Sequence, residues 1–118
     1  MKKIFLVFTF LSILLCGCSA KSTSEKAQSI IEKDMNCDII VSECLFNKDS
    51  NAVFVKFHSS EYGDDEAIVT LKDNKVFYES VYSEIGSTDY DKLIEYGDYS
   101  LMMYDITVNG GENWKEVE

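Results

Sequence analysis

The chain has 118 residues, of which 46% are hydrophobic and 13% aromatic, and its net charge at neutral pH is −10. This length suits one small domain with a real core and is too short for two independent cores. The charge arises from 11 lysines and no arginine against 21 acidic residues, a balance that repels nucleic acid and anionic lipid. We therefore expect no nucleic-acid partner.

The first twenty residues have the three regions of an export signal. Lys2 and Lys3 precede an apolar run over residues 4–15, and small residues follow as far as Ala20. The apolar run is shorter than the roughly 20 residues that a membrane-spanning helix needs. The segment therefore indicates export rather than a transmembrane helix.

The order Leu15-Cys16-Gly17-Cys18 resembles the lipobox of bacterial lipoproteins. The resemblance implies that residues 1–17 are a signal peptide and that Cys18 is lipidated and begins the mature chain. It also implies a lipid anchor at the cell membrane, on its extracytoplasmic face, because several acyl chains together anchor stably. An ordinary secretory signal, cleaved among the small residues, is the alternative. After removal of the signal, nine lysines remain against 21 acidic residues, a net charge of −12.

We assign residues 18–24 to the lipidated cysteine and a polar spacer, and residues 25–118 to a single extracytoplasmic domain. The domain begins near Ser22-Thr23-Ser24-Glu25, a capping box that can satisfy free amide donors at a helix start. Apolar residues then recur near helical spacing, at Ala27, Ile30, Ile31 and Met35. The pattern predicts an amphipathic helix over 23–35 that covers a sheet.

Strand-like stretches follow this helix. In residues 52–58, Val53, Val55 and Phe57 alternate with the other side chains, as in a half-buried strand. Lys72-Asp73-Asn74-Lys75 is a polar stretch suited to a hairpin turn. The predicted strands form an antiparallel meander and comprise residues 37–46, 52–58, 67–71 and 76–85.

The C-terminal third predicts a short helix between Gly86 and Gly97, with Asp89 and Asp91 in its first turn. Residues 99–108 then alternate and end in β-branched and aromatic residues, which favours a strand, although a competing interpretation extends the helix through them. Residues 114–117 are expected to return as a short strand. The fold class is therefore α+β, a helix on a curved antiparallel sheet, and this element order resembles the cystatin-like and nuclear-transport-factor-like folds.

The segment Thr107-Val108-Asn109-Gly110-Gly111-Glu112-Asn113-Trp114 resembles the Asp-box hairpin of sialidase-type β-propellers. Thr107, Gly111 and Trp114 match the family pattern, whereas Asn109 stands where the family prefers Asp. The match covers eight residues and occurs once, while a propeller needs several blades. We interpret the segment as structural, a tight turn with Trp114 packed over it.

Residues suited to catalysis or metal binding are few. Cys37 and Cys44 are separated by too much extended chain for a disulfide unless a turn intervenes, so two separate thiols are expected and a bridge stays an alternative. His58 is the single histidine; no nucleophile elbow accompanies it, and we interpret it as a solvated residue. The acidic stretch 64–66 lacks the register of a calcium loop. We therefore assign no catalytic residue, metal ligand or cofactor and expect no enzyme activity.

Tyrosine and methionine are numerous in the second half of the chain, and such residues are enriched at protein interfaces. We take as the candidate binding surface Tyr78, Tyr82, Tyr96, Tyr99 and Met103. The expected function is a membrane-anchored, small protein-binding or inhibitory module, such as one that confers immunity to a toxin. Its partner is expected to be a basic protein, because opposite charge speeds association. The alternative is a small-ligand carrier or enzyme with a pocket between helix and sheet.

Overall fold

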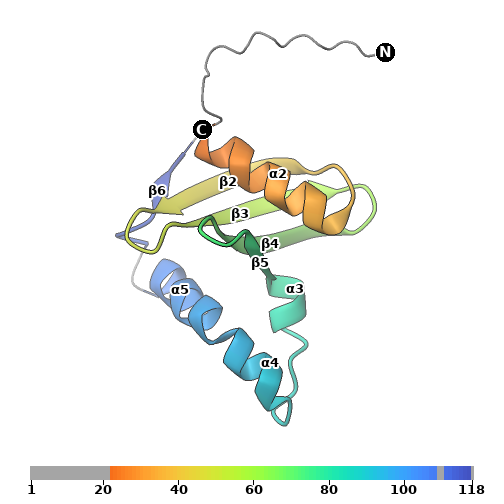
Figure 1. Cartoon of the computed structure of the whole chain (residues 1–118), viewed down its shortest axis with the longest axis vertical. Coiled ribbons are helices and arrows are strands. Elements are labelled where there is room, and N and C mark those ends of the chain that lie inside the picture. Colours follow the sequence, from red (N-terminus) through yellow and green to blue (C-terminus); the bar gives the residue numbers. More distant parts are fainter. Residues whose placement is uncertain (1–21, 109–110, 118) are drawn as a thin grey trace, which may run out of the picture.

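The computed structural model describes residues 22–108 and 111–117 and confirms the predicted α+β fold, a helix packed against a five-stranded antiparallel sheet (Figure 1). The strands are β2 (Ile40–Asn47), β3 (Ala52–Ser59), β4 (Gly63–Thr70), β5 (Lys75–Tyr78) and β6 (Lys115–Glu116). Their order in the sheet is β5-β4-β3-β2-β6, so the predicted meander is present and the last strand joins β2. The predicted signal peptide and Cys18 lie outside the described residues.

Helix α2 (Thr23–Met35) begins at the predicted capping box. The Ser22 hydroxyl accepts a hydrogen bond from the Glu25 backbone N–H at 3.2 Å, and the Glu25 carboxylate accepts one from the Ser22 N–H at 3.0 Å. Asn36 ends the helix in the left-handed conformation, which asparagine tolerates well. Ala27 and Ile31 are fully buried against the sheet, so the helix covers one face as predicted.

Two apolar clusters lie on opposite faces of the sheet. Successive side chains of a strand alternate between faces, and on β3 Val53, Val55 and Phe57 face α2 while Ala52 and Phe54 face the other side. The second face is covered by the C-terminal helices α4 (Tyr90–Glu95) and α5 (Gly97–Thr107), which lie on the side of the sheet opposite α2 (Figure 1). Helices therefore pack on both faces of the sheet, α2 on one face and α4 and α5 on part of the other.

The strand prediction for residues 99–108 is wrong, because this segment forms α5 and the competing helical interpretation holds. Helical spacing turns Tyr96, Tyr99 and Met103 to one side, where they pack against the second cluster. Apolar residues of this segment lie on both sides of the helix, so their alternation along the sequence is compatible with a helix as well as with a strand. Packing against Phe54, Ile68 and Phe77 thus outweighs the strand propensity of single residues.

Two strand boundaries also differ from the prediction. Strand β5 ends at Tyr78, and the chain turns into the short helix α3 (Glu79–Tyr82) instead of continuing as a strand to Ile85. Strand β4 begins at Gly63, so the acidic residues before Ala67 are part of the sheet rather than a loop. This longer strand pairs Asp64 with His58 and Glu66 with Lys56, which brings charged side chains together on the sheet.

Candidate functional site

The second face of the sheet is covered over only half of its length. Along β3, Ala52 and Phe54 are buried beneath the C-terminal helices, whereas Lys56 and His58, which point to the same side, are exposed. The neighbouring strands follow the same change, because Glu66 replaces an apolar residue beside Lys56 and Ile68 is buried beside Phe54. The uncovered half is charged where the covered half is apolar.

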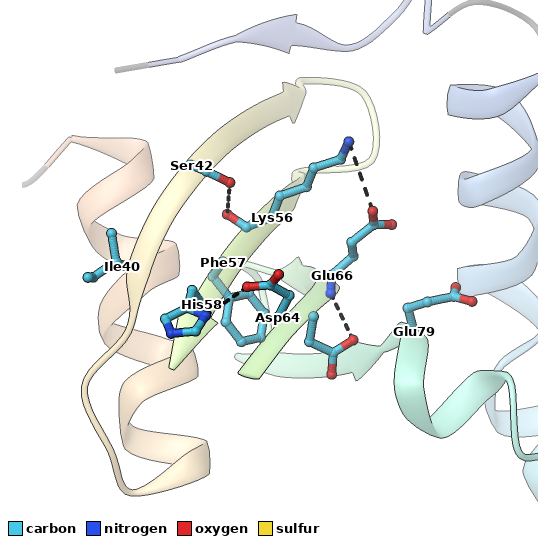
Figure 2. A pocket seen from close by; sticks show the side chains of 9 residues that line it. Ile40, Ser42, Lys56, Phe57, His58, Asp64, Glu66 and Glu79 are labelled. Atoms are coloured by element: carbon cyan, nitrogen blue, oxygen red, sulfur yellow. Dashed lines mark hydrogen bonds and ion pairs between the residues drawn. The ribbon is translucent and has the colours of Figure 1, made fainter. Parts of the chain in front are cut away.

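A shallow groove of about 680 Å³ lies over this uncovered half (Figure 2). It is lined by Ile40, Ser42, Lys56, Phe57, His58, Asp64, Asp65, Glu66 and Glu79. Strands β2, β3 and β4 form its floor, and α3 supplies Glu79 at one side (Figure 2). Ile40, paired with His58 across β2 and β3, is 71% exposed and gives the groove an apolar contact point.

Lys56 lies between two carboxylates on neighbouring strands. Its Nζ is 3.5 Å from Glu43 Oε1 and 4.0 Å from Glu66 Oε2. All three side chains are partly exposed, and solvent screening leaves such ion pairs with about 1 kcal/mol or less each. The lysine therefore offsets part of the local negative charge without fixing the groove rigidly.

His58 Nδ1 is 2.7 Å from Asp64 Oδ1 across the β3–β4 pair (Figure 2). Both side chains are largely exposed, which agrees with the interpretation of His58 as a solvated residue. Ser59 follows His58 in the chain but points to the opposite face, where it is buried and its hydroxyl accepts the Tyr62 N–H. The histidine and this serine therefore do not form a nucleophile–base pair.

The groove has an excess of negative charge. Four carboxylates line it, those of Asp64, Asp65, Glu66 and Glu79, together with a single lysine. Asp65 Oδ2 accepts the Ser80 hydroxyl at 2.6 Å, and Glu79 accepts the Tyr99 hydroxyl at 2.8 Å. Within the described ranges, no three histidine, cysteine or acidic side chains are grouped so that they could hold a metal ion. The arrangement suits contact with a cationic surface rather than coordination of a metal.

The structure does not bring the five predicted binding residues onto one surface. Tyr99 is fully buried and Tyr96 is 5% exposed, so these two offer no contact area in this fold. Tyr82 and Met103 are half-buried against the same cluster. Tyr78 lies on the other face, where its hydroxyl donates to Asp34. The tyrosines of the second cluster do not form the predicted binding surface, because they join α4 and α5 to the sheet. Tyr96, for example, packs edge-on against Phe77.

Burial has a chemical consequence for two of these tyrosines. Desolvation raises the pKa of Tyr99 well above its ordinary value, and its hydrogen bond to Glu79 raises it further. The pKa of Tyr78 is raised in the same way, by burial first and then by its hydrogen bond to Asp34. Both phenols therefore stay neutral at physiological pH and act as hydrogen-bond donors that join separate elements.

The two cysteines of the described chain are free, as the separate-thiol interpretation predicted. Cys44 is buried, and desolvation raises its thiol pKa to about 11, whereas Cys37 is half-buried. A thiol with a raised pKa carries little thiolate at neutral pH and reacts slowly. Neither cysteine is part of the groove.

The predicted hairpin before Trp114 is absent because α5 ends at Thr107 and the segment joins a helix, not a strand, to β6. Asn109 and Gly110 lie outside the described residues. Trp114 is buried in the second cluster, and its indole Nε1 donates to Asp105 Oδ2 at 3.0 Å. The structural interpretation of Trp114 therefore agrees with its packing.

The alternative pocket was expected between α2 and the sheet. That interface is filled by apolar side chains, with Ala27, Ile31, Val53 and Val55 all fully buried. The groove lies on the opposite face, and sequence reasoning missed Lys56, Asp64 and Glu66. The sequence does contain an indication of them, charged residues at alternate positions in two adjacent strands. The predicted strand began only after the acidic stretch, so these charges were not placed on the sheet.

Comparison of the chain with protein-family models, with curated proteins and with solved structures gave no match. The resemblance to cystatin-like folds is therefore not confirmed beyond the α+β class. Over residues 22–108 and 111–117, none of the helices has both the length and the apolar character that crossing a bilayer requires.

Proposed function

We propose that this chain is a lipid-anchored extracytoplasmic module that binds a basic segment of a protein partner in the groove. The observation that carries the proposal is the uncovered half of the sheet, where four acidic residues, with Asp64 the most exposed, line the groove together with a single lysine. Lysine or arginine side chains of a partner would replace water around Asp64 and Glu66, and Ile40 would supply apolar contact. Complementary charge of this kind raises the association rate and favours basic partners over acidic ones.

The edge of β2 gives this partner a second means of attachment. On the side of β2 away from β3, β6 is the strand found in the described part of the chain; it pairs with Leu45 and Phe46, and the Val117 N–H donates to Cys44 O at 3.0 Å. The preceding residues, from Ile40 to Glu43, lie beside the groove, and no strand of the described chain pairs with this side of them, so an extended segment could pair there. A β-bulge between Val41 and Glu43 limits the length of such pairing. The partner segment is therefore short and extended.

The proposed anchor would keep this surface close to a membrane. Three residues separate Cys18 from Ser22, the first described residue, so the two positions lie at most about 14 Å apart when the chain is extended. A partner at or near the same membrane would meet the groove at a raised local concentration. An inhibitory role, such as protection against a basic toxin, is a form of this function because occupation of the partner's basic segment would block it.

The alternative of a small-ligand carrier or enzyme has less support. The described helix–sheet interface on the α2 side is packed with apolar side chains, and the groove is open rather than enclosed. A small ligand usually needs a site that buries most of its surface. The proposal therefore includes no catalytic residue and no cofactor.

The test is site-specific photocrosslinking of the full chain in membranes of the producing cell. A photoreactive residue at position 40 is expected to form an adduct with a basic protein, whereas one at Lys33, exposed on α2, is expected to form none. The Asp64→Lys variant and raised salt should both weaken the adduct. Absence of an adduct at position 40, equal adducts at both positions, or insensitivity to Asp64→Lys would contradict the proposal. Mass spectrometry of Cys18 tests the anchor separately.

A further inference from the structure

The outer side of α4 and α5 has an exposed apolar stripe. Its large side chains are between 58% and 78% exposed, although all are aliphatic or aromatic. We define the outer seam by the residues Tyr90, Ile94, Gly97, Leu101, Tyr104 and Val108. Contiguous exposed apolar surface of this kind marks an interaction site more often than scattered apolar residues do.

The outer seam has the spacing of a coiled-coil interface. Successive members are four, three, four, three and four residues apart, which keeps them on one stripe of a helix. Tyr96 separates α4 from α5, with φ −94° and ψ 10°. Its N–H donates to Lys92 O and its own oxygen accepts the Ser100 N–H, both at 2.9 Å, so the two helices follow one another directly. The stripe therefore continues from α4 into α5.

Within residues 22–108 and 111–117, the other elements leave this seam uncovered. The opposite side of the same helices is already used, since Tyr96 and Tyr99 are buried in the second cluster and Met103 and Ile106 pack against it. Leu101 and Tyr104 point away from that cluster and are exposed. Helices α4 and α5 thus have one apolar side that packs against the sheet and a second apolar side that is exposed.

Acidic residues border the seam in the same repeat. Asp91, Asp98 and Asp105 each precede a seam residue by three positions, and Asp91 and Asp98 are exposed. Asp105 accepts the Trp114 indole N–H. Lys92 is the single basic residue of α4 and α5, and it pairs with Glu95 at 3.5 Å. A second copy of this chain would bring the same acidic border against this one, whereas a helix with basic borders would complement it.

We propose that the outer seam binds one amphipathic helix of a protein partner, in which lysine or arginine borders the apolar stripe. Apolar side chains of that helix would pack between Ile94, Leu101 and Tyr104, with Gly97 allowing close approach of the backbone. Basic side chains would lie beside Asp91 and Asp98. This surface is separate from the groove, since none of its residues lines the groove.

The test uses two synthetic helical peptides with the same apolar stripe, one with lysine and one with glutamate at the border positions. Binding to the full chain in zwitterionic lipid nanodiscs is measured by fluorescence anisotropy. The lysine peptide is expected to bind about tenfold tighter than the glutamate peptide or better. Leu101→Asp is expected to lower its affinity about tenfold or more.

Two further variants separate this proposal from the groove. Asp98→Lys should lower the affinity of the lysine peptide about threefold and raise that of the glutamate peptide, because one border charge is reversed. Ile40→Ser, in the groove, should lower the affinity of the lysine peptide less than Leu101→Asp does. Circular dichroism checks that each variant is folded.

Equal binding of both peptides, binding of neither, or an effect of Ile40→Ser as large as that of Leu101→Asp would overturn the proposal. A dimer of the full chain that Leu101→Asp dissociates would assign the seam to a second copy and overturn it as well. Loss of photocrosslinks at position 40 would instead count against the groove and leave these peptide results unchanged.

Discussion

The two faces of the sheet are covered to different extents. Strand β3 buries the side chains that face α2 along its length, whereas on the other side burial stops at Phe54 and Lys56 and His58 are exposed. The covered parts have apolar residues on both neighbouring strands, and the uncovered part has charges. The position at which α5 ceases to cover the sheet therefore defines the site, and no special sequence motif is needed.

Adjacent residues of β3 provide the largest contrast between the faces. Phe57→Ala is expected to lower the free energy of unfolding by about 3–5 kcal/mol, because Phe57 is buried beneath α2 and its loss leaves a cavity. His58→Ala is expected to change it by about 0.5 kcal/mol or less, since the side chain is exposed. Urea unfolding followed by circular dichroism measures both. Equal losses would mean that the second face is not open at His58.

Alkaline pH tests the helical cover of the second face. Burial raises the pKa of Tyr99 and Tyr78 in the folded state, while the unfolded chain ionises these tyrosines near pH 10. The unfolded state therefore holds fewer protons above this pH, and the free energy of unfolding should fall by at most about 1.4 kcal/mol per pH unit for each tyrosine. Below pH 10 the contribution is fully present.

The matched variant for this effect is Tyr99→Phe, which keeps the ring and removes the ionisable hydroxyl. It should reduce the steepness of the alkaline loss, measured by urea unfolding at several pH values. Tyr104→Phe is the control, because it removes the hydroxyl of an exposed tyrosine on the same helix. An unchanged slope in Tyr99→Phe would show that Tyr99 is not buried as described.

The cap of α2 has a smaller effect on the fully covered face. Ser22→Ala removes the acceptor for the Glu25 N–H and should cost about 1 kcal/mol of stability. Ser22→Asp keeps an acceptor at that position and should retain most of the stability. Thermal unfolding of the two variants makes the comparison, and equal destabilisation by both would argue against the capping box.

The smallest stability effect is expected in the groove itself. Lys56→Met should change the free energy of unfolding by less than about 0.5 kcal/mol, because its ion pairs with Glu43 and Glu66 are exposed to solvent. The same change removes the lysine that lines the groove and should raise its affinity for a basic peptide. Calorimetry of the variant with a lysine-rich peptide checks this; a weaker affinity would contradict the assignment of the groove.

The sequence predicted correctly those elements that are determined by residues close together in the chain. The capping box at Ser22 fixes the start of α2 as predicted, whereas Asp89, expected within the first turn of α4, is its N-cap and accepts the Lys92 N–H. The alternation in β3 likewise identified a strand. These signals depend on neighbours in the chain, so a single sequence carries them.

Elements whose structure depends on contacts with residues distant in the chain were predicted wrongly. Residues 99–108 suit either a strand or a helix, and the choice is made by packing of Tyr99 against Phe77 on another element, with ring centroids 6.2 Å apart. The acidic start of β4 is a strand because it pairs with β3, which composition alone does not reveal. The groove was missed for the same reason, since its charges meet only after β3 and β4 are placed side by side.

The central claim is that the uncovered half of the sheet is the surface that binds a basic segment. Nuclear magnetic resonance of the full chain in nanodiscs, titrated with a lysine-rich peptide, tests it directly. If the groove binds the peptide, the amide signals of Ile40, His58, Asp64 and Glu66 shift with increasing peptide, while those of α2 do not. Shifts centred on α2, or none in the groove at saturating peptide, would contradict it.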